Sequence, residues 1–494
     1  MLRLGGSAVD AAIATNAVLA VTGPHLCGLG GDLFALVHDG NGVHALNASG
    51  RAGSGSDAEA LRRDGHHEMP FRHDIRTVTM PGCVDGWIEL HRRFGRLALD
   101  ELLRPAIEAA ERGAEASPLL VASVRLLDDR GHAQLSELAE QATGRHAVVV
   151  RPGTARALRA IVSQGRDGFY LGEFGRGLLE LGRGVFSADD FQRSSAEWVE
   201  PLHADVAGFR LHTIPPNSQA YLLLASALLA ERSGSIGRLD DPAVAHLLIE
   251  CSKVVGRNRP ALLHEHADVS AVLDEARAGR PAVDPTRASA WSVPSSPGDT
   301  TYLCAVDADG MGVSLIQSNA SGFGSWLAEP STGINVHNRG LGFSLEPGHP
   351  AELGPGRRPP HTLSPALATH PDGRLRAVFG TMGGDAQPQI LLQVAAHLLV
   401  HGLDPSAAVN SSRWILQGTT GGFDTWSEVA QPSVVLETTS PAGLGEALTD
   451  LGHQVTVSSI GSTFGHAHAI VVEPDGEAAG GADHRALIGS AEAA

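Results

Sequence analysis

Strand-like segments occur in adjacent pairs along this chain, and this pattern constrains the fold more than any other feature of the sequence. Residues 33–37 and 43–46 are apolar runs joined by an Asp-Gly-Asn-Gly turn, which predicts a β-hairpin. Residues 301–306 and 312–317 flank a second turn in the same way. Because strands and helices do not alternate strictly, the pattern favours a layered α+β sandwich over a doubly wound parallel sheet.

Segments in which apolar residues have helical spacing precede and follow these strand pairs. Residues 8–20 are small and carry few charges, which predicts a helix buried on most of its faces. Residues 267–297 have the least regular pattern, and we expect them to be the least ordered part of the chain. Further helices are expected at 86–127, 155–181, 220–229, 388–401 and 441–451, and further strands at 209–214 and 376–379.

Composition excludes several classes of protein. Lys253 is the only lysine, so a nucleotide-binding P-loop, a protein kinase and a Ser-x-x-Lys hydrolase are excluded. The net charge of −18 argues against nucleic-acid and anionic-membrane partners, which require dense positive charge. We find neither a long apolar run nor a signal-like segment, and we expect a cytoplasmic protein with no membrane contact.

The cysteines and histidines do not form a recognisable metal motif. The four cysteines are widely spaced, which is typical of reduced thiols. Among the 24 histidines the tightest groups are His66-His67, His264-Glu265-His266 and His466-Ala467-His468. None has the H-E-x-x-H spacing of a zinc enzyme. We therefore predict no metal and no cofactor.

The junction between Asp299 and Thr300 carries the first indication of function. A loop rich in Pro, Ser and Gly delivers Asp-Thr-Thr directly onto the strand at 301–306. If this peptide bond were cut, Thr300 would carry a free α-amine that can act as general base for its own hydroxyl. An ordinary turn before a strand is the alternative interpretation of the same residues.

Motifs along most of the chain resemble the gamma-glutamyltranspeptidase family of N-terminal-nucleophile hydrolases. They are the segments at 5–12 (GGSAVDAA), 28–31 (GLGG), 81–84 (PGCV), 197–201 (EWVEP), 215–219 (PPNSQ), 300–310 (TTYLCAVDADG) and 381–384 (TMGG). The resemblance implies a four-layer αββα sandwich. It also implies self-cleavage into residues 1–299 and 300–494, which would remain intertwined as one globular domain of two chains.

The same resemblance assigns catalytic roles. Thr300 matches the nucleophile that forms an acyl-enzyme with an amide substrate, and Asp299 precedes the processing site. Ser318 matches a second hydroxyl near the nucleophile. Gly383 and Gly384 match the glycine pair whose backbone N–H groups form the oxyanion hole, although a tight turn after a strand is the alternative interpretation.

The predicted substrate pocket departs from that of the true transpeptidases. The positions that bind the α-ammonium of a γ-glutamyl group read Ala320, Arg339 and Gly342, an arginine with no acid, and a guanidinium repels an ammonium. His361 and Thr362 match the serine pair that binds the α-carboxylate. The carboxylate-clamping arginine is matched by Ser49, with Arg51 two residues further on, and Asp385 follows the glycine pair.

These departures predict a small carboxylate-bearing amide as substrate, as in the oxamate amidohydrolase and cephalosporin acylase branches that the motifs resemble. Arg339, Arg51, His361, Thr362 and Asp385 are the predicted substrate-binding residues. Two alternatives stay open: a genuine gamma-glutamyltransferase, and an unprocessed pseudoenzyme with a binding or structural role. Because the family has a strand and helix before the GGSAVDAA segment, either the start codon lies upstream or an edge strand is missing.

Self-cleavage is the expectation that separates the enzyme from the pseudoenzyme. We expect a denaturing gel to resolve two fragments, residues 1–299 and 300–494, and Thr300→Ala to remain a single chain because it lacks the attacking hydroxyl. Continued cutting of the alanine variant at this bond would show that Thr300 is not the nucleophile.

Overall fold

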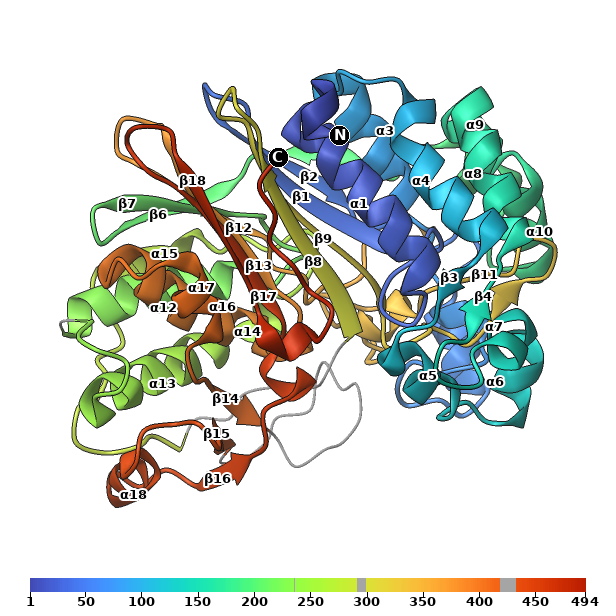
Figure 1. The fold of residues 1–494 in the computed structure, drawn as a ribbon. Coiled ribbons are helices and arrows are strands. Elements are labelled where there is room, and N and C mark those ends of the chain that lie inside the picture. The colour runs from blue at the N-terminus through green and yellow to red at the C-terminus, as the bar shows by residue number, and fades with distance from the viewer. Residues whose placement is uncertain (235, 291–298, 418–431) are drawn as a thin grey trace.

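Two antiparallel sheets lie face to face at the centre of the molecule (Figure 1). The structure is a computed structural model that describes residues 1–234, 236–290, 299–417 and 432–494. The first sheet has the order β5 (Glu197–Val199), β2 (Val43–Ala48), β1 (Asp32–His38), β9 (Gly312–Ala320) and β8 (Asp299–Val306). The second has the order β18 (Ala478–Ala482), β17 (Ala467–Val472), β13 (Leu375–Thr381), β12 (Ala366–Thr369), β7 (Phe209–Thr213) and β6 (Leu202–Val206).

Helices cover the outer face of each sheet (Figure 1). On the first sheet lie α1 (Ala8–Thr22) and α3 (Cys83–Phe94), and the helices packed on these or on one another are α4 (Leu99–Arg112), α8 (Pro152–Gln164), α9 (Arg166–Tyr170) and α10 (Glu173–Leu181). On the second lie α12 (Tyr221–Ser233), α16 (Gln387–Ala395) and α17 (Pro405–Asn410), and α13 (Pro242–Gly256) and α15 (Ser270–Arg277) pack on α12. The layers are therefore helix, sheet, sheet and helix, the αββα sandwich that the family resemblance implies.

Smaller elements complete the chain. A three-stranded sheet of β14 (Trp414–Gln417), β15 (Ser433–Glu437) and β16 (Val455–Ser458) lies beside α18 (Leu444–Asp450). Short helices are α2 (Ala58–Arg63), α5 (Pro118–Val124), α6 (Asp129–Gln134), α7 (Ser136–Gln141), α11 (Ala188–Gln192) and α14 (Arg259–Leu262). Two-residue strands are β3 (Ala114–Glu115), β4 (Val148–Val149), β10 (Ala328–Glu329) and β11 (Ile334–Asn335).

The side chains of β1 show why its sequence is apolar without a break. Leu33, Ala35 and Val37 pack against the helices, whereas Phe34 and Leu36 pack between the two sheets. A strand with both faces covered needs apolar residues at every position. No described helix has the length and apolar character needed to cross a bilayer.

Most of the helices and strands expected from periodicity are confirmed, and one expectation is wrong. The hairpin of β1 and β2, the pair β8 and β9, and helices α1 and α12 lie where the sequence predicts them. Residues 270–277, expected to be poorly ordered, form α15 because Leu273 and Ala276 pack into the core cluster that contains α12. Residues 278–290 form no helix or strand, in line with that expectation, and its last part, at 291–297, lies outside the described residues.

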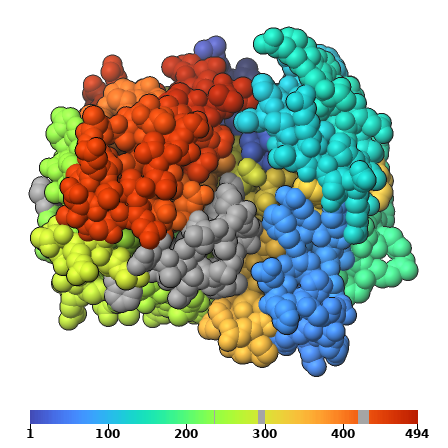
Figure 2. All heavy atoms as spheres, turned by 90° about the horizontal axis from the view of Figure 1, so that it is seen from below, coloured from blue at the N-terminus to red at the C-terminus, as the bar shows by residue number. Residues whose placement is uncertain are grey.

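Both sides of the Asp299–Thr300 junction contribute to both sheets. In the first sheet β1 pairs with β9, and in the second β7 pairs with β12. Figure 2 shows the surface from below, where C-terminal residues in red and orange lie on the left of the view and N-terminal residues in blue and cyan lie on the right. A cut at the junction would therefore separate two chains that share both sheets and the helical layer on the second sheet.

The contact between the sheets predicts the effect of one substitution. A Cβ on Gly380 of β13 would lie 2.0 Å from the Tyr302 ring of β8, so Gly380→Ala should lower the free energy of unfolding by about 2 kcal/mol. Gly42→Ala is the matched control, because no described atom lies within 4 Å of its Cβ. Equal unfolding midpoints for both variants would contradict this packing.

Candidate active site

Thr300 and Ser318 meet at the end of two neighbouring strands. The register of β8 against β9 shifts between Asp299 and Thr301, and the buried Thr300 hydroxyl donates to Ser318 Oγ over 3.2 Å. Ser318 Oγ in turn donates to the carbonyl oxygen of Asp299 over 2.7 Å and accepts from the N–H of Ala320. A hydroxyl offers one donor and two acceptor sites, so the Ser318 hydroxyl is fully used.

In the uncut chain the predicted nucleophile, the Thr300 hydroxyl, and the predicted scissile carbonyl of Asp299 therefore both hydrogen-bond to Ser318 Oγ. A hydrogen bond to the Asp299 carbonyl withdraws charge from it and favours attack on its carbon. The Asp299 carboxylate lies nearby, where its Oδ2 accepts from the N–H of Gly322 over 2.9 Å. Burial raises the pKa of this carboxyl, against the opposing effects of the Gly322 N–H and Arg72. Residues 295–298 of the loop lie outside the described residues.

The GLGG segment at 28–31 packs on β9 directly behind Ser318. The amide of Gln317 bonds both the N–H and the carbonyl of Gly28. A Cβ on Gly31 would lie 2.3 Å from the Ser318 carbonyl oxygen, so only glycine allows this approach.

A buried charge cluster occupies the next strand. Asp32 of β1 is paired with Ser318 in the sheet register, and its Oδ2 accepts from Arg339 Nε over 2.7 Å and from His361 Nε2 over 2.9 Å. His337 Nδ1 lies 3.4 Å from the same oxygen. All four side chains are almost completely buried.

Electrostatics fix the protonation states in this cluster. Burial alone would raise the pKa of Asp32, but Arg339 and His361 hold it well below its usual range. Burial, reinforced by the Arg339 charge, lowers the pKa of His361 to about 4. A neutral His361 donates from Nε2 to Asp32, and its Nδ1 accepts from the N–H of Leu363. Both ring nitrogens are therefore used inside the protein.

The expectation of an arginine with no acid is wrong, because the Asp32 carboxylate balances Arg339. The two residues are 307 positions apart, and no local motif connects them. Arg339 Nη1 lies 3.4 Å from Thr362 Oγ1, whereas Nη2 is buried and has no partner among the described residues. Asp32 Oδ1 likewise has no partner there. His337 Nδ1 also lacks a hydrogen-bond partner among the described residues, so the cluster retains unused polar atoms on Arg339, Asp32 and His337.

The other predicted arginine is engaged at the surface. Arg51 pairs with Glu197 over 2.9 Å and with Glu265 over 3.1 Å. A different guanidinium, that of the buried Arg358, donates to Ser49 Oγ over 3.2 Å. Arg358, which the sequence spacing did not identify, therefore places a buried positive charge beside Ser49.

Gly383 and Gly384 form a turn at the end of β13, with φ of +138° and +57°. The N–H of Ala386 bonds the Gly383 carbonyl over 3.1 Å. Asp385, the next residue, is buried and forms an ion pair with the buried Arg259 of α14. Asp385, in residues 300–494, therefore pairs with an arginine from residues 1–299.

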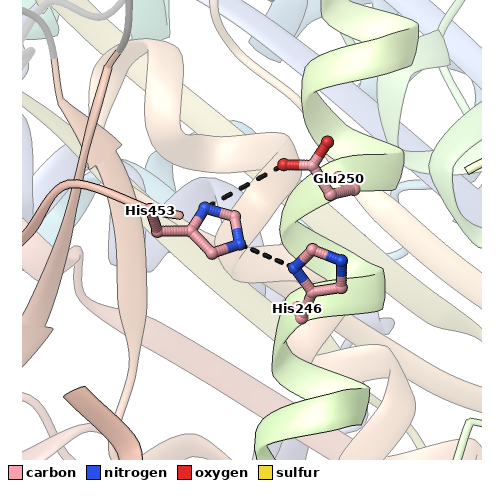
Figure 3. A group of neighbouring side chains, drawn as sticks. All are labelled: His246, Glu250 and His453. Atoms are coloured by element: carbon pink, nitrogen blue, oxygen red, sulfur yellow. Dashed lines mark hydrogen bonds and ion pairs between the residues drawn. The ribbon is translucent and has the colours of Figure 1, made fainter. Parts of the chain in front are cut away.

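One group of described residues could hold a metal ion: His246, Glu250 and His453, all buried (Figure 3). His246 Nδ1 lies 2.7 Å from His453 Nε2, whereas Glu250 lies nearest the opposite nitrogen of the His453 ring. Lys253 Nζ donates to Glu250 over 2.9 Å and lies 3.4 Å from His453 Nδ1. Because an ammonium already balances the carboxylate, the geometry favours a hydrogen-bonded network. None of the three histidine groups found in the sequence belongs to it.

The four-layer sandwich is the fold of the N-terminal-nucleophile hydrolases. The family model described as Gamma-glutamyltranspeptidase matches residues 1–493, so the chain belongs to the gamma-glutamyltranspeptidase family. It is 34% identical to the oxamate amidohydrolase proenzyme of Klebsiella pneumoniae, covering 98% of this chain and 94% of that protein.

Two further relatives agree with this assignment. The glutathione hydrolase-like YwrD proenzyme of Bacillus subtilis is 31% identical over 98% of this chain and 94% of its own length. The crystal structure of cephalosporin acylase from Bacillus halodurans superposes with a TM-score of 0.88 at 33% identity, covering 98% of this chain and 91% of that one. The relatives are named hydrolases and acylases, and the chain is an enzyme of this kind.

The shared hydroxyl predicts a specific defect. Ser318→Ala should slow cleavage of the Asp299–Thr300 bond about 100-fold, because the scissile carbonyl loses its donor. Ser314→Ala is the matched control, since it removes a buried hydroxyl from the same strand that bonds Tyr302 instead. Pulse-chase gels measure the rate, and identical rates for the two variants would remove Ser318 from the processing step.

Proposed function

We propose that this protein is a self-processing amidohydrolase in which Thr300 cleaves a small amide bearing a carboxylate. The observation that carries the proposal is the Ser318 hydroxyl, which bonds both the Thr300 hydroxyl and the Asp299 carbonyl. In the precursor the Thr300 hydroxyl attacks that carbonyl, and water resolves the resulting ester. Processing leaves Thr300 at the start of a new chain.

The freed α-amine then acts as general base for the Thr300 hydroxyl. The hydroxyl attacks the substrate amide, the amine leaves, and water hydrolyses the acyl-enzyme. N–H groups of Gly383 and Gly384 are the proposed donors to the oxyanion, a role that suits a turn of two glycines at the end of a strand. Transfer of the acyl group to an amine instead of water, and residence in the cytoplasm, stay predictions.

Arg339 is the residue we assign to the substrate carboxylate. Its Nη2 is buried without a partner among the described residues, and Nη1 faces Thr362 Oγ1. A carboxylate that accepted from Nη2 and from Thr362 would satisfy this donor, since guanidinium groups favour paired hydrogen bonds to carboxylates. The name of the Klebsiella relative, an oxamate amidohydrolase, agrees with such a substrate. His361, Asp385 and Arg51 have protein partners, and we assign them to holding the pocket.

A γ-glutamyl substrate is the second candidate, and one observation favours it. Asp32 Oδ1 is a buried carboxylate oxygen without a partner in the described part of the chain, and it could accept from an α-ammonium. Because Asp32 balances the charge of Arg339, the repulsion expected from the sequence is weaker. The Bacillus subtilis relative is named glutathione hydrolase-like.

Kinetics separate the two substrates. We expect higher kcat/KM on oxamate or a glutaryl amide than on a γ-glutamyl anilide. Arg339→Lys should raise KM for the carboxylate-bearing amide about 10- to 100-fold, because one charged hydrogen bond is lost. KM for an uncharged amide of similar size is the control and should stay unchanged. A clear preference of the wild-type enzyme for the anilide would contradict the proposed substrate.

A further inference from the structure

The PPNSQ segment at 215–219 forms the support of the predicted carboxylate-binding segment. Asn217 Nδ2 donates to the Pro359 carbonyl, and Ser218 Oγ donates to the Leu363 carbonyl over 2.6 Å. The Gln219 N–H donates to the carbonyl of His361 over 2.9 Å. Residues 217–219, before the junction, thus hold residues 359–363, after the junction.

The Gln219 side chain extends this support to the glycine turn. Its Nε2 donates to the Thr362 carbonyl over 3.0 Å and to the Gly384 carbonyl over 3.1 Å. An amide nitrogen has two hydrogens, so both are used. Gln219 is completely buried. One side chain therefore fixes the distance between the predicted carboxylate contact and the predicted oxyanion turn.

Arg259 orients this glutamine. Arg259 Nε donates to Gln219 Oε1 over 3.1 Å, and Nη2 donates to Asp385. Because a guanidinium cannot accept a hydrogen bond, the glutamine atom that faces it must be the oxygen. The nitrogen is thereby directed at Thr362 and Gly384. The Arg259 and Asp385 side chains are both only 2% exposed.

We propose that Gln219 and Arg259 are positioning residues for the oxyanion turn, an inference that rests on the proposed function. Gly384 has a φ of +57° and no Cβ to restrict it, so hydrogen bonds from outside the turn must limit its conformations. Gln219 holds its carbonyl and Arg259 holds the following side chain. Together they direct the N–H groups of the turn at the reacting carbonyl of a bound amide.

Self-cleavage provides an internal control for this role. In the uncut chain the Asp299 carbonyl accepts from Ser318, whereas Gln219 donates to the carbonyls of Thr362 and Gly384 and Arg259 donates to Gln219 and Asp385. Loss of the positioning network should therefore slow substrate turnover and leave the processing rate unchanged. A general defect in folding would reduce both.

The test compares Gln219→Glu, Arg259→Met and Arg259→Lys with Arg238→Met, a control that removes an exposed arginine paired with Asp240. Gln219→Glu keeps the oxygen that faces Arg259 and removes the two donors. We expect Gln219→Glu and Arg259→Met to process normally and to lose kcat about 10- to 100-fold with little change in KM. Arg259→Lys should recover part of the loss.

Three results would overturn the inference: unchanged kcat in both variants, a loss confined to KM, or equal losses of processing and turnover. A wild-type chain that neither processes nor hydrolyses any of the amides tested would instead contradict the proposed function itself. The two failures are thus distinguishable in one set of assays.

Discussion

The candidate active site depends on one buried hydroxyl, that of Ser318. Its oxygen accepts from Thr300, accepts from the backbone of Ala320 and donates to the Asp299 carbonyl, which uses all of its hydrogen-bonding capacity. This arrangement requires β8 and β9 to be paired across the junction. It also requires Gly31, in the loop before β1, because a Cβ at this position would collide with the Ser318 carbonyl oxygen and force the strands apart.

The neighbouring strand, β1, contributes the carboxylate of a buried charge cluster. A carboxylate on β1 is surrounded by a guanidinium and two imidazoles, and burial keeps His361 neutral. A buried ion is tolerated only where partners satisfy it. Here the satisfaction is incomplete at Arg339 Nη2 and Asp32 Oδ1, and such unpaired atoms are the expected feature of a site completed by a ligand. The same pair of atoms accounts for both candidate substrates.

Local patterns predicted the hairpins, the buried helix α1 and the layered class of the fold, because these depend on residues close together in sequence. Family resemblance predicted Thr300 and Ser318 as neighbours, and the structure places them 3.2 Å apart. Partners distant in sequence were not predictable from one chain. Asp32 and Arg339 are 307 positions apart in the sequence, and Gln219 and Gly384 are 165 positions apart. The sequence did not predict α15 because only two of its residues, Leu273 and Ala276, are buried. Two apolar positions are too few to give a clear helical periodicity.

The central claim is that Thr300 is the nucleophile that carries the acyl group. The most direct measurement is the mass of the fragment that begins at Thr300 after the processed enzyme is mixed with a slowly hydrolysed amide and quenched in acid. We expect this fragment to gain the mass of the acyl group and peptide mapping to locate the group on Thr300. An acyl group on another residue, or steady turnover while Thr300 stays unmodified in every quenched sample, would contradict it.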